Sequence, residues 1–239
     1  MAYAPVMIDA SPIATETSEL TCESCHKPVA LCVCADIPAV KNPIANKVAL
    51  LILQHPQEQD VDLGTARLTA LHFKNATVKV GLSWPSLGKA LGRDADPKRW
   101  AILYLGSVKA KELMPNRDVV ALTKKGTAMP NQDAALADIE GIILLDGTWS
   151  QAKALWWRNA WMLKAQRVAL NPRFPSRYGK LRKEPRRDGL STLEAAGLLL
   201  SRLEQKPEIE TTLWAGFDKM LLRYRALREE AKRALSKDS

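Results

Sequence analysis

The four cysteines of the chain fall within thirteen residues, at Cys22, Cys25, Cys32 and Cys34. Four thiolates so close together can surround one tetrahedral Zn²⁺, and two closely spaced pairs suit the tight turns of a zinc knuckle. We expect reduced thiols and a structural metal, because one short segment supplies every ligand. His26 could replace one cysteine as a ligand, and two unrelated pairs of free thiols are the alternative.

A second group of polar residues follows an apolar run. The run 141–145 leads into Asp146-Gly-Thr-Trp149, after which a helix is predicted. An acidic residue at the carboxyl end of a buried strand lies where open α/β sheets bind ligands. The structural alternative is that Asp146 or Thr148 only caps the helix that begins near Ser150.

A third pattern, at Ser191 and Glu194, has the Ser-x-x-Glu spacing of a helix capping box. We therefore predict that a helix begins at Ser191. This structural role does not compete with binding, because the start of a helix also presents free backbone amides to a ligand.

The whole chain carries a formal net charge of +9, and its basic residues are concentrated in one block. Between positions 164 and 187 the single acid is Glu184. Such a block suits a phosphate backbone, and a solvated surface or a basic helix end is the alternative. The basic residues are Lys164, Arg167, Arg173, Arg177, Lys180, Arg182, Lys183, Arg186 and Arg187.

The composition limits the class of protein. No apolar run reaches 18 residues, so we predict no transmembrane helix and no membrane partner. The N-terminus lacks a basic stretch followed by an apolar one, so we expect no secretory signal. These observations favour the cytoplasm, and nothing in the sequence indicates an obligate protein partner.

The elements that must position these residues alternate between strands and helices. Continuous apolar runs are typical of strands buried on both faces of a parallel sheet, so the pattern predicts an α/β fold with helices on both faces. The predicted strands are 48–53, 76–80, 101–105, 119–122, 142–145 and 168–170. The predicted helices are 63–73, 86–92, 133–139, 150–165, one from Ser191 and one over 208–235.

We divide the chain into three parts. Residues 1–19 have little pattern and are expected to form a mobile leader, and residues 20–45 form the cysteine-rich zinc module. Residues 46–239 form the main domain with its C-terminal helices. The last helix has apolar residues at spacings of three and four, which predicts a stripe packed on the core.

The sequence resembles the DTW-domain family, which is related by fold to the SPOUT methyltransferases. The signature Asp-x-Thr-Trp is matched by residues 146–149, and further motifs of the family follow the same order along the chain. They are His55-Pro-Gln-Glu58, Gly64-Thr-Ala-Arg67, Arg182-Lys-Glu-Pro185 and Leu190-Ser-Thr-Leu-Glu-Ala195, together with the cysteine cluster. This ordered set covers residues 22 to about 200.

The resemblance implies a tRNA-uridine aminocarboxypropyltransferase with a SPOUT-like fold and a C-terminal trefoil knot. The enzyme would move the 3-amino-3-carboxypropyl group of S-adenosylmethionine to N3 of a tRNA uridine, leaving methylthioadenosine. By this resemblance the cofactor-binding residues are Leu145, Asp146, Gly147, Thr148, Trp149, Leu190, Ser191, Thr192 and Glu194. The RNA-binding residues are Arg67, Arg177, Lys180, Arg182 and Lys183.

Within this reading, Asp146 is the candidate general base, because uridine N3 must lose a proton before it attacks. Thr148 and Trp149 would shape the cofactor pocket. Trp149 could instead be structural, since we expect Trp156, Trp157 and Trp161 of the following helix to take part in its packing.

Two other functions are compatible with these features. A SPOUT-type RNA methyltransferase would use the same cofactor and leave S-adenosylhomocysteine. A non-catalytic zinc-containing RNA-binding protein would bind tRNA without modifying it.

Overall fold

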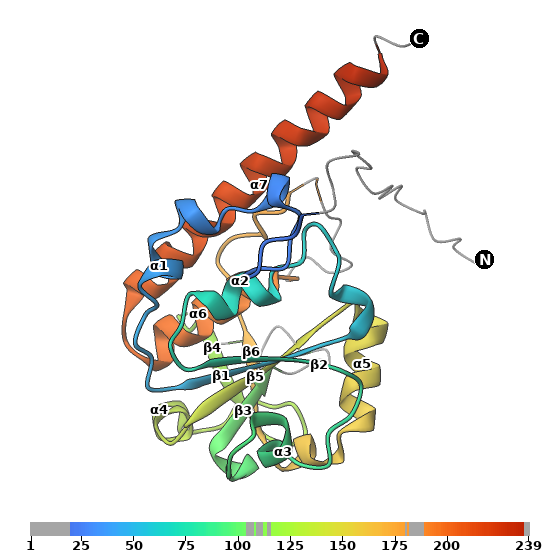
Figure 1. Cartoon of the computed structure of the whole chain (residues 1–239). Helices are drawn as coiled ribbons and strands as arrows, with labels where there is room; N and C mark the ends of the chain where they lie inside the picture. The colour runs from blue at the N-terminus through green and yellow to red at the C-terminus, as the bar shows by residue number, and fades with distance from the viewer. Residues whose placement is uncertain are drawn as a thin grey trace, which may run out of the picture.

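The computed structural model describes residues 20–103, 108, 112–113, 116–179, 181 and 189–236 (Figure 1). The predicted leader at residues 1–19 lies outside the described residues. So do three of the predicted RNA-binding residues, Lys180, Arg182 and Lys183.

Six strands form one mostly parallel sheet in the order β2-β1-β5-β3-β6-β4, in which β4 is antiparallel to β6. All six predicted strands are confirmed, with ends that differ by one or two residues where they can be compared. Positions 104–105 of the predicted strand 101–105 lie outside the described residues. The strands are β1 (Ala49–Gln54), β2 (Ala76–Val80), β3 (Trp100–Leu103), β4 (Val119–Leu122), β5 (Gly141–Asp146) and β6 (Gln166–Leu170).

Helices cover both faces of the sheet, as predicted (Figure 1). Among the described residues the α-helices are α1 (Pro38–Lys41), α2 (Ala66–Leu71), α3 (Leu87–Leu91), α4 (Gln132–Ala137), α5 (Trp149–Arg158), α6 (Thr192–Leu203) and α7 (Pro207–Leu235). Short 3₁₀ turns are η1 (Val29–Leu31), η2 (Cys34–Asp36), η3 (Pro56–Glu58), η4 (Pro97–Arg99) and η6 (Ala160–Lys164).

The core consists of two layers, one on each face, because successive side chains of a strand point to opposite sides. In β1, Leu50 and Ile52 pack with α2, α6 and α7, whereas Leu51 and Leu53 pack with α3 and η6. Burial on both faces explains the continuous apolar runs from which these strands were predicted.

The helix predicted over 150–165 is interrupted at Asn159. The Asn159 side chain donates to the carbonyls of Leu155 (2.7 Å) and Leu82 (3.0 Å) and accepts from the amide of Trp84 (2.8 Å). The prediction of one continuous helix was wrong, because this buried amide ends α5 and a 3₁₀ turn follows.

The cysteine-rich segment packs on the same core as the main sheet. Val33 and Ile37 are buried with residues of α6 and α7, and Arg223 of α7 donates to the Ala30 carbonyl at 2.6 Å. The C-terminal part of α7 projects away from the sheet (Figure 1). Within the described ranges, no helix is long and apolar enough to cross a membrane.

Candidate functional site

The carboxyl ends of β1 and β5 bring together the residues of the candidate site. The two strands are adjacent and parallel, with Gln54 in register with Asp146. The Asp146 side chain is buried, and its Oδ2 accepts a hydrogen bond from Gln54 Nε2 at 2.9 Å. Its Oδ1 accepts a hydrogen bond from the Thr192 hydroxyl at the start of α6. Three elements therefore meet on one carboxylate.

The loop after β1 closes over this edge. The His55 amide donates to the Asp146 carbonyl at 2.9 Å, and Gln151 Nε2 donates to Gln57 Oε1 at 3.1 Å. Gly147 permits this approach, because a Cβ at that position would lie 2.9 Å from Gln151 Cβ and 3.4 Å from His55 Cβ. The motif glycine thus serves close packing between β5, η3 and α5.

The two interpretations of the Asp-Gly-Thr-Trp segment apply to different residues. Thr148 caps α5 in a capping box, in which its amide donates to Gln151 Oε1 at 2.6 Å. Asp146 does not cap this helix, since its carboxylate bonds to Gln54 and Thr192 instead. The structural alternative therefore holds for Thr148, and Asp146 stays a candidate for chemistry.

The predicted capping box at the start of α6 is confirmed. The Ser191 amide and hydroxyl both donate to Glu194 Oε2, at 2.8 and 2.7 Å. The buried Glu194 carboxylate also accepts from the Ser176 hydroxyl at 2.8 Å and from the Arg177 amide at 2.7 Å. Glu194 thus joins the loop after β6 to α6.

The two predicted RNA-binding arginines that the structure describes lie in different settings. Arg67 is half-buried on α2, and its Nε has no hydrogen-bond partner among the described residues. Arg177 is ion-paired with Asp218 at 3.1 Å, and its guanidinium lies 4.6 Å from the centroid of the Trp214 ring.

A cavity of about 540 Å³ opens beside α6 and α7, within the usual size range of small-molecule sites. It shares Leu190 and Glu194 with the predicted cofactor residues and Arg177 with the predicted RNA-binding residues, whereas Asp146 does not line it. On its wall the buried Asp118 pairs with Arg173 (2.9 Å) and Arg202 (2.7 Å).

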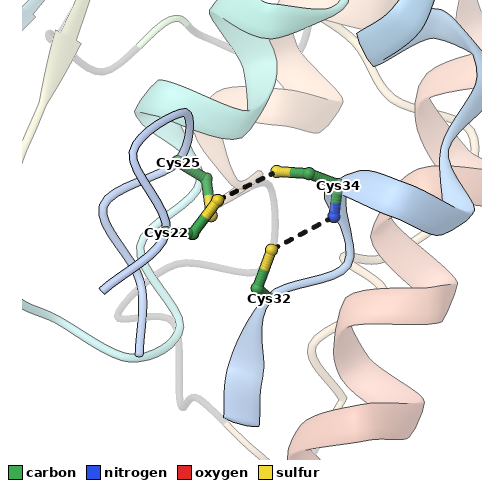
Figure 2. Close-up of side chains that lie close together, drawn as sticks. All are labelled: Cys22, Cys25, Cys32 and Cys34. Carbon is green, nitrogen blue, oxygen red and sulfur yellow. Dashed lines mark hydrogen bonds between the residues drawn. The ribbon is translucent and has the colours of Figure 1, made fainter. Parts of the chain in front are cut away.

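The four cysteines gather as predicted, with all four Sγ atoms within 4.8 Å of one another (Figure 2). The Sγ atoms of Cys22 and Cys34 lie 4.0 Å apart. Zinc–sulfur bonds of about 2.3 Å in a tetrahedron place sulfurs about 3.8 Å apart, so the group fits one zinc ion. His26 is exposed and is not part of this group.

The thiols of the cluster differ in acidity. Burial raises the pKa of the Cys25 thiol to about 11. Burial also acts to raise the pKa of Cys22, but hydrogen bonds from the Cys25 backbone and the Cys32 side chain outweigh it and bring the value down to about 7. Thiolates are the metal-binding form, so Cys22 reaches it at a lower pH than Cys25 does.

Lys27 was not singled out from the sequence, yet it links the cysteine cluster to the candidate site. Its buried Nζ donates to the Asp62 carbonyl at 2.6 Å. Burial lowers the pKa of Lys27, and the negative charges of Cys25, Asp62 and Asp146 oppose that shift. The ammonium group therefore lies within electrostatic reach of Asp146.

Gln54 was also missed, because an amide at a strand end carries no sequence signal of its own. Its Nε2 bonds to Asp146, while its Oε1 is buried and has no partner among the described residues. The signal that could have found Gln54 is its position in β1, the strand that ends directly before the His55 motif.

The fold and its site define an α/β protein with a buried carboxylate at the carboxyl edge of a mostly parallel sheet. A four-cysteine segment precedes the first strand of that sheet. The model of the DTW domain matches residues 19–225. The chain belongs to the DTW domain family, which confirms the resemblance seen in the sequence.

The curated relatives that match the chain share the same protein name. The chain is 30% identical over 192 residues to "tRNA-uridine aminocarboxypropyltransferase 2" of Macaca fascicularis, and 31% identical over 194 residues to the protein of that name from Drosophila melanogaster. Each match covers 80% of this chain, which spans 59% of the macaque protein and 70% of the fly protein. No solved structure shows a significant match to the chain.

Proposed function

We propose that this protein transfers the 3-amino-3-carboxypropyl group of S-adenosylmethionine to N3 of a uridine in tRNA. Membership of the DTW family and the names of the relatives support this activity. The observation that carries it is Asp146, a buried carboxylate at the sheet edge that is held from two sides by Gln54 and Thr192.

Asp146 is the general base of the proposed reaction. Each of its oxygens accepts one hydrogen bond, which fixes the plane of the carboxylate and leaves further lone pairs for a proton. Uridine N3 donates its proton to Asp146 and becomes nucleophilic. When bound, S-adenosylmethionine supplies the electrophilic γ-carbon next to sulfur, and methylthioadenosine leaves.

The orphaned Gln54 Oε1 supports a ligand at this edge. A buried acceptor without a partner costs free energy, which a ligand that donates a hydrogen bond would recover. The amino group of the methionine moiety could donate to it, while the uridine N3 proton goes to Asp146. Gln54 is therefore a positioning residue for both Asp146 and the bound ligand.

The remaining assignments belong to the same proposal. The cofactor is held by Leu145, Asp146, Gly147, Thr148, Trp149, Leu190, Ser191, Thr192 and Glu194. At the start of α6, the amides of Ser191, Leu193 and Glu194 already donate within the protein. A SPOUT-like fold with a C-terminal trefoil knot belongs to this proposal, as does a structural Zn²⁺ held by the cysteine cluster in a module over residues 20–45 that packs on the catalytic domain over 46–239. The protein acts in the cytoplasm.

Arginine and lysine side chains would bind the tRNA backbone. Arg67, Arg177, Lys180, Arg182 and Lys183 are proposed for this role. Arginine offers a planar fork that matches a phosphate or the carboxylate of the cofactor. The target uridine is splayed out of its stack to expose N3.

The test is nucleoside mass spectrometry of tRNA incubated with the protein and S-adenosylmethionine. The expected products are 3-(3-amino-3-carboxypropyl)uridine and methylthioadenosine. Formation of S-adenosylhomocysteine with a methylated nucleoside would identify a methyltransferase instead. Bound but unmodified tRNA would favour a non-catalytic RNA-binding protein.

A variant and a control sharpen this test. Asp146→Asn preserves shape but removes the proton acceptor, so the rate is expected to fall by about 10²- to 10⁴-fold, with tRNA binding retained. Asp133→Asn, at an exposed aspartate on α4, should leave the rate unchanged. Equal rates for wild type and Asp146→Asn would remove Asp146 from the chemistry.

A further inference from the structure

The outer face of α5 carries two tryptophans and a lysine at spacings of four residues. Trp149, Lys153 and Trp157 therefore lie on one side of the helix. Trp149 is 36% exposed and Trp157 is 77% exposed, whereas Ala152 and Leu155 on the opposite side are buried.

The exposure of Trp157 departs from our expectation that it takes part in packing. Trp161, four residues later, is only 7% exposed and donates to the Trp84 carbonyl at 3.0 Å. The break at Asn159 separates the two, so Trp161 turns into the core while Trp157 stays outside. Core packing thus gives no reason for a tryptophan at position 157, and exposed aromatic surface of this kind often marks a binding site.

The charge of this face favours a polyanionic partner. No aspartate or glutamate occurs between Asp146 and Glu184, so α5 carries only the basic residues Lys153 and Arg158. Lys153 Nζ lies 5.5 Å from the centroid of the Trp149 ring, and both charged residues of α5 are exposed. Alternating aromatic and basic groups are the recurrent surface for unpaired nucleic acid.

The face also begins at the candidate site. Thr148 caps α5 two residues after Asp146, so the helix begins at Trp149, at the carboxyl edge of the sheet. At a rise of 1.5 Å per residue, Trp157 lies about 12 Å along the helix from Trp149. This is about three to four steps of a stacked strand at roughly 3.4 Å per nucleotide.

We infer that the outer face of α5 is a stacking platform for unpaired tRNA bases that flank the target uridine. Trp157 stacks on a base, and Lys153 contacts the adjacent phosphates. This inference rests on the proposed function for the identity of the RNA, and it names a substrate-binding surface that shares only Trp149 with the residues proposed to hold the cofactor.

The test compares Trp157→Ala, Trp157→Leu and Trp157→Phe in the full chain. Binding of tRNA and of a uridine oligonucleotide is measured by fluorescence anisotropy without S-adenosylmethionine. Loss of one base–aromatic stack should weaken binding by about 10- to 100-fold in the Ala and Leu variants. Phe should retain most of the affinity, because it retains a stacking ring.

Two further measurements make the test specific. Lys153→Gln should lower the slope of log K against log salt by about one, because one phosphate contact is lost. Leu222→Ala, which truncates a 62% exposed apolar side chain on α7, should bind RNA as the wild type does. Unchanged thermal unfolding of each Trp157 variant checks that the fold is intact.

Three outcomes would overturn the inference. Wild-type affinity for RNA in Trp157→Ala would show that no base stacks there. Wild-type affinity in Trp157→Leu alone would indicate an apolar contact rather than stacking. A change in oligomeric state with unchanged RNA affinity would make α5 an interface between copies of the chain.

The outcomes also separate this inference from the proposed function. If RNA binding depends on Trp157 but no modified nucleoside forms, the proposed activity fails and the stacking surface stands. If 3-(3-amino-3-carboxypropyl)uridine forms with an unchanged KM for tRNA in Trp157→Ala, the stacking surface fails and the activity stands.

Discussion

At the scale of single residues, the candidate site depends on how one carboxylate is held. Gln54 and Thr192 come from β1 and α6, and each donates to a different oxygen of Asp146. The carboxylate is therefore oriented by two elements that are far from it in sequence. A base held in this way needs little reorganisation when its substrate arrives.

Gln54→Glu tests the positioning role through a pH profile. The substitution replaces a donor 2.9 Å from Asp146 by a second carboxylate. Two carboxylates at that distance share a proton, and the pKa of one of them is strongly raised. Because the reaction needs an ionised base, activity should appear only at higher pH than in the wild type. If the acid limb of the pH–activity profile of Gln54→Glu stays at its wild-type position, a positioning role is contradicted. Gln57→Glu in the neighbouring turn serves as the control.

At the scale of elements, the contacts between β3 and β5 show how tightly the sheet is built. Trp100 lies opposite Gly141 in the parallel register. A Cβ at position 141 would come within 2.6 Å of the Trp100 ring, so only glycine fits beneath this fully buried indole. The pair fixes the start of the strand that ends in Asp146.

Gly141→Ala should lower the free energy of unfolding by about 1–3 kcal/mol, the usual cost of overpacking a core. Thermal or urea unfolding measures the change. Gly197→Ala is a matched control on α6, because its Cβ would make ordinary contacts no shorter than 3.5 Å. That variant should gain stability, since alanine favours a helix over glycine by up to about 1 kcal/mol. Equal losses in both variants would refute the packing argument.

The packing of α2 against α7 predicts a dependence of stability on pH. His72 is fully buried, donates from Nδ1 to the Leu68 carbonyl at 2.7 Å, and faces Gly216 with Nε2. Burial lowers its pKa from the model-peptide value of 6.5. Below about pH 6.5 the unfolded chain binds a proton that the folded chain does not, so stability present above that pH is lost as the pH falls.

Urea unfolding between pH 7.5 and 5.5 should show this loss, at most about 1.4 kcal/mol per pH unit for one group. His72→Asn does not titrate and should remove the contribution of residue 72 to the slope. His26→Asn, at an exposed position, should keep the slope. A wild-type slope in the His72 variant would assign the effect to other groups.

At the scale of the whole molecule, the cysteine cluster holds the N-terminal segment against both α7 and the candidate site. Arg223 and Lys219 of α7 donate to carbonyls of the segment, at Ala30 and Asp36. Lys27 reaches the loop at Asp62 on the other side. Unfolding of the N-terminal segment would therefore remove contacts that hold the loop at Asp62, next to the carboxyl edge of the sheet.

Removal of the metal is expected to affect stability and activity together. A strong chelator should release one zinc per chain and lower the melting temperature, because binding of the metal stabilises the folded segment directly. Metal analysis and thermal unfolding measure both effects. The Cys22→Ser variant should bind no zinc even before the chelator is added, so the chelator should not change its melting temperature. A wild-type chain without bound metal after purification in zinc would contradict the proposed site.

The sequence by itself determined the strands, the cysteine cluster and the cap at Ser191, because periodicity, ligand spacing and capping are signals between near neighbours in the chain. That Thr148 and not Asp146 caps α5 was decided by the structure. Only the tertiary structure decided that Gln54 and Thr192 meet on Asp146 and that Lys27 approaches the same edge, since these contacts depend on the register of β1 against β5 and on the docking of α6. It also decided that Trp157 faces outward, because the turn at Asn159 depends on carbonyl and amide partners more than seventy residues earlier, at Leu82 and Trp84.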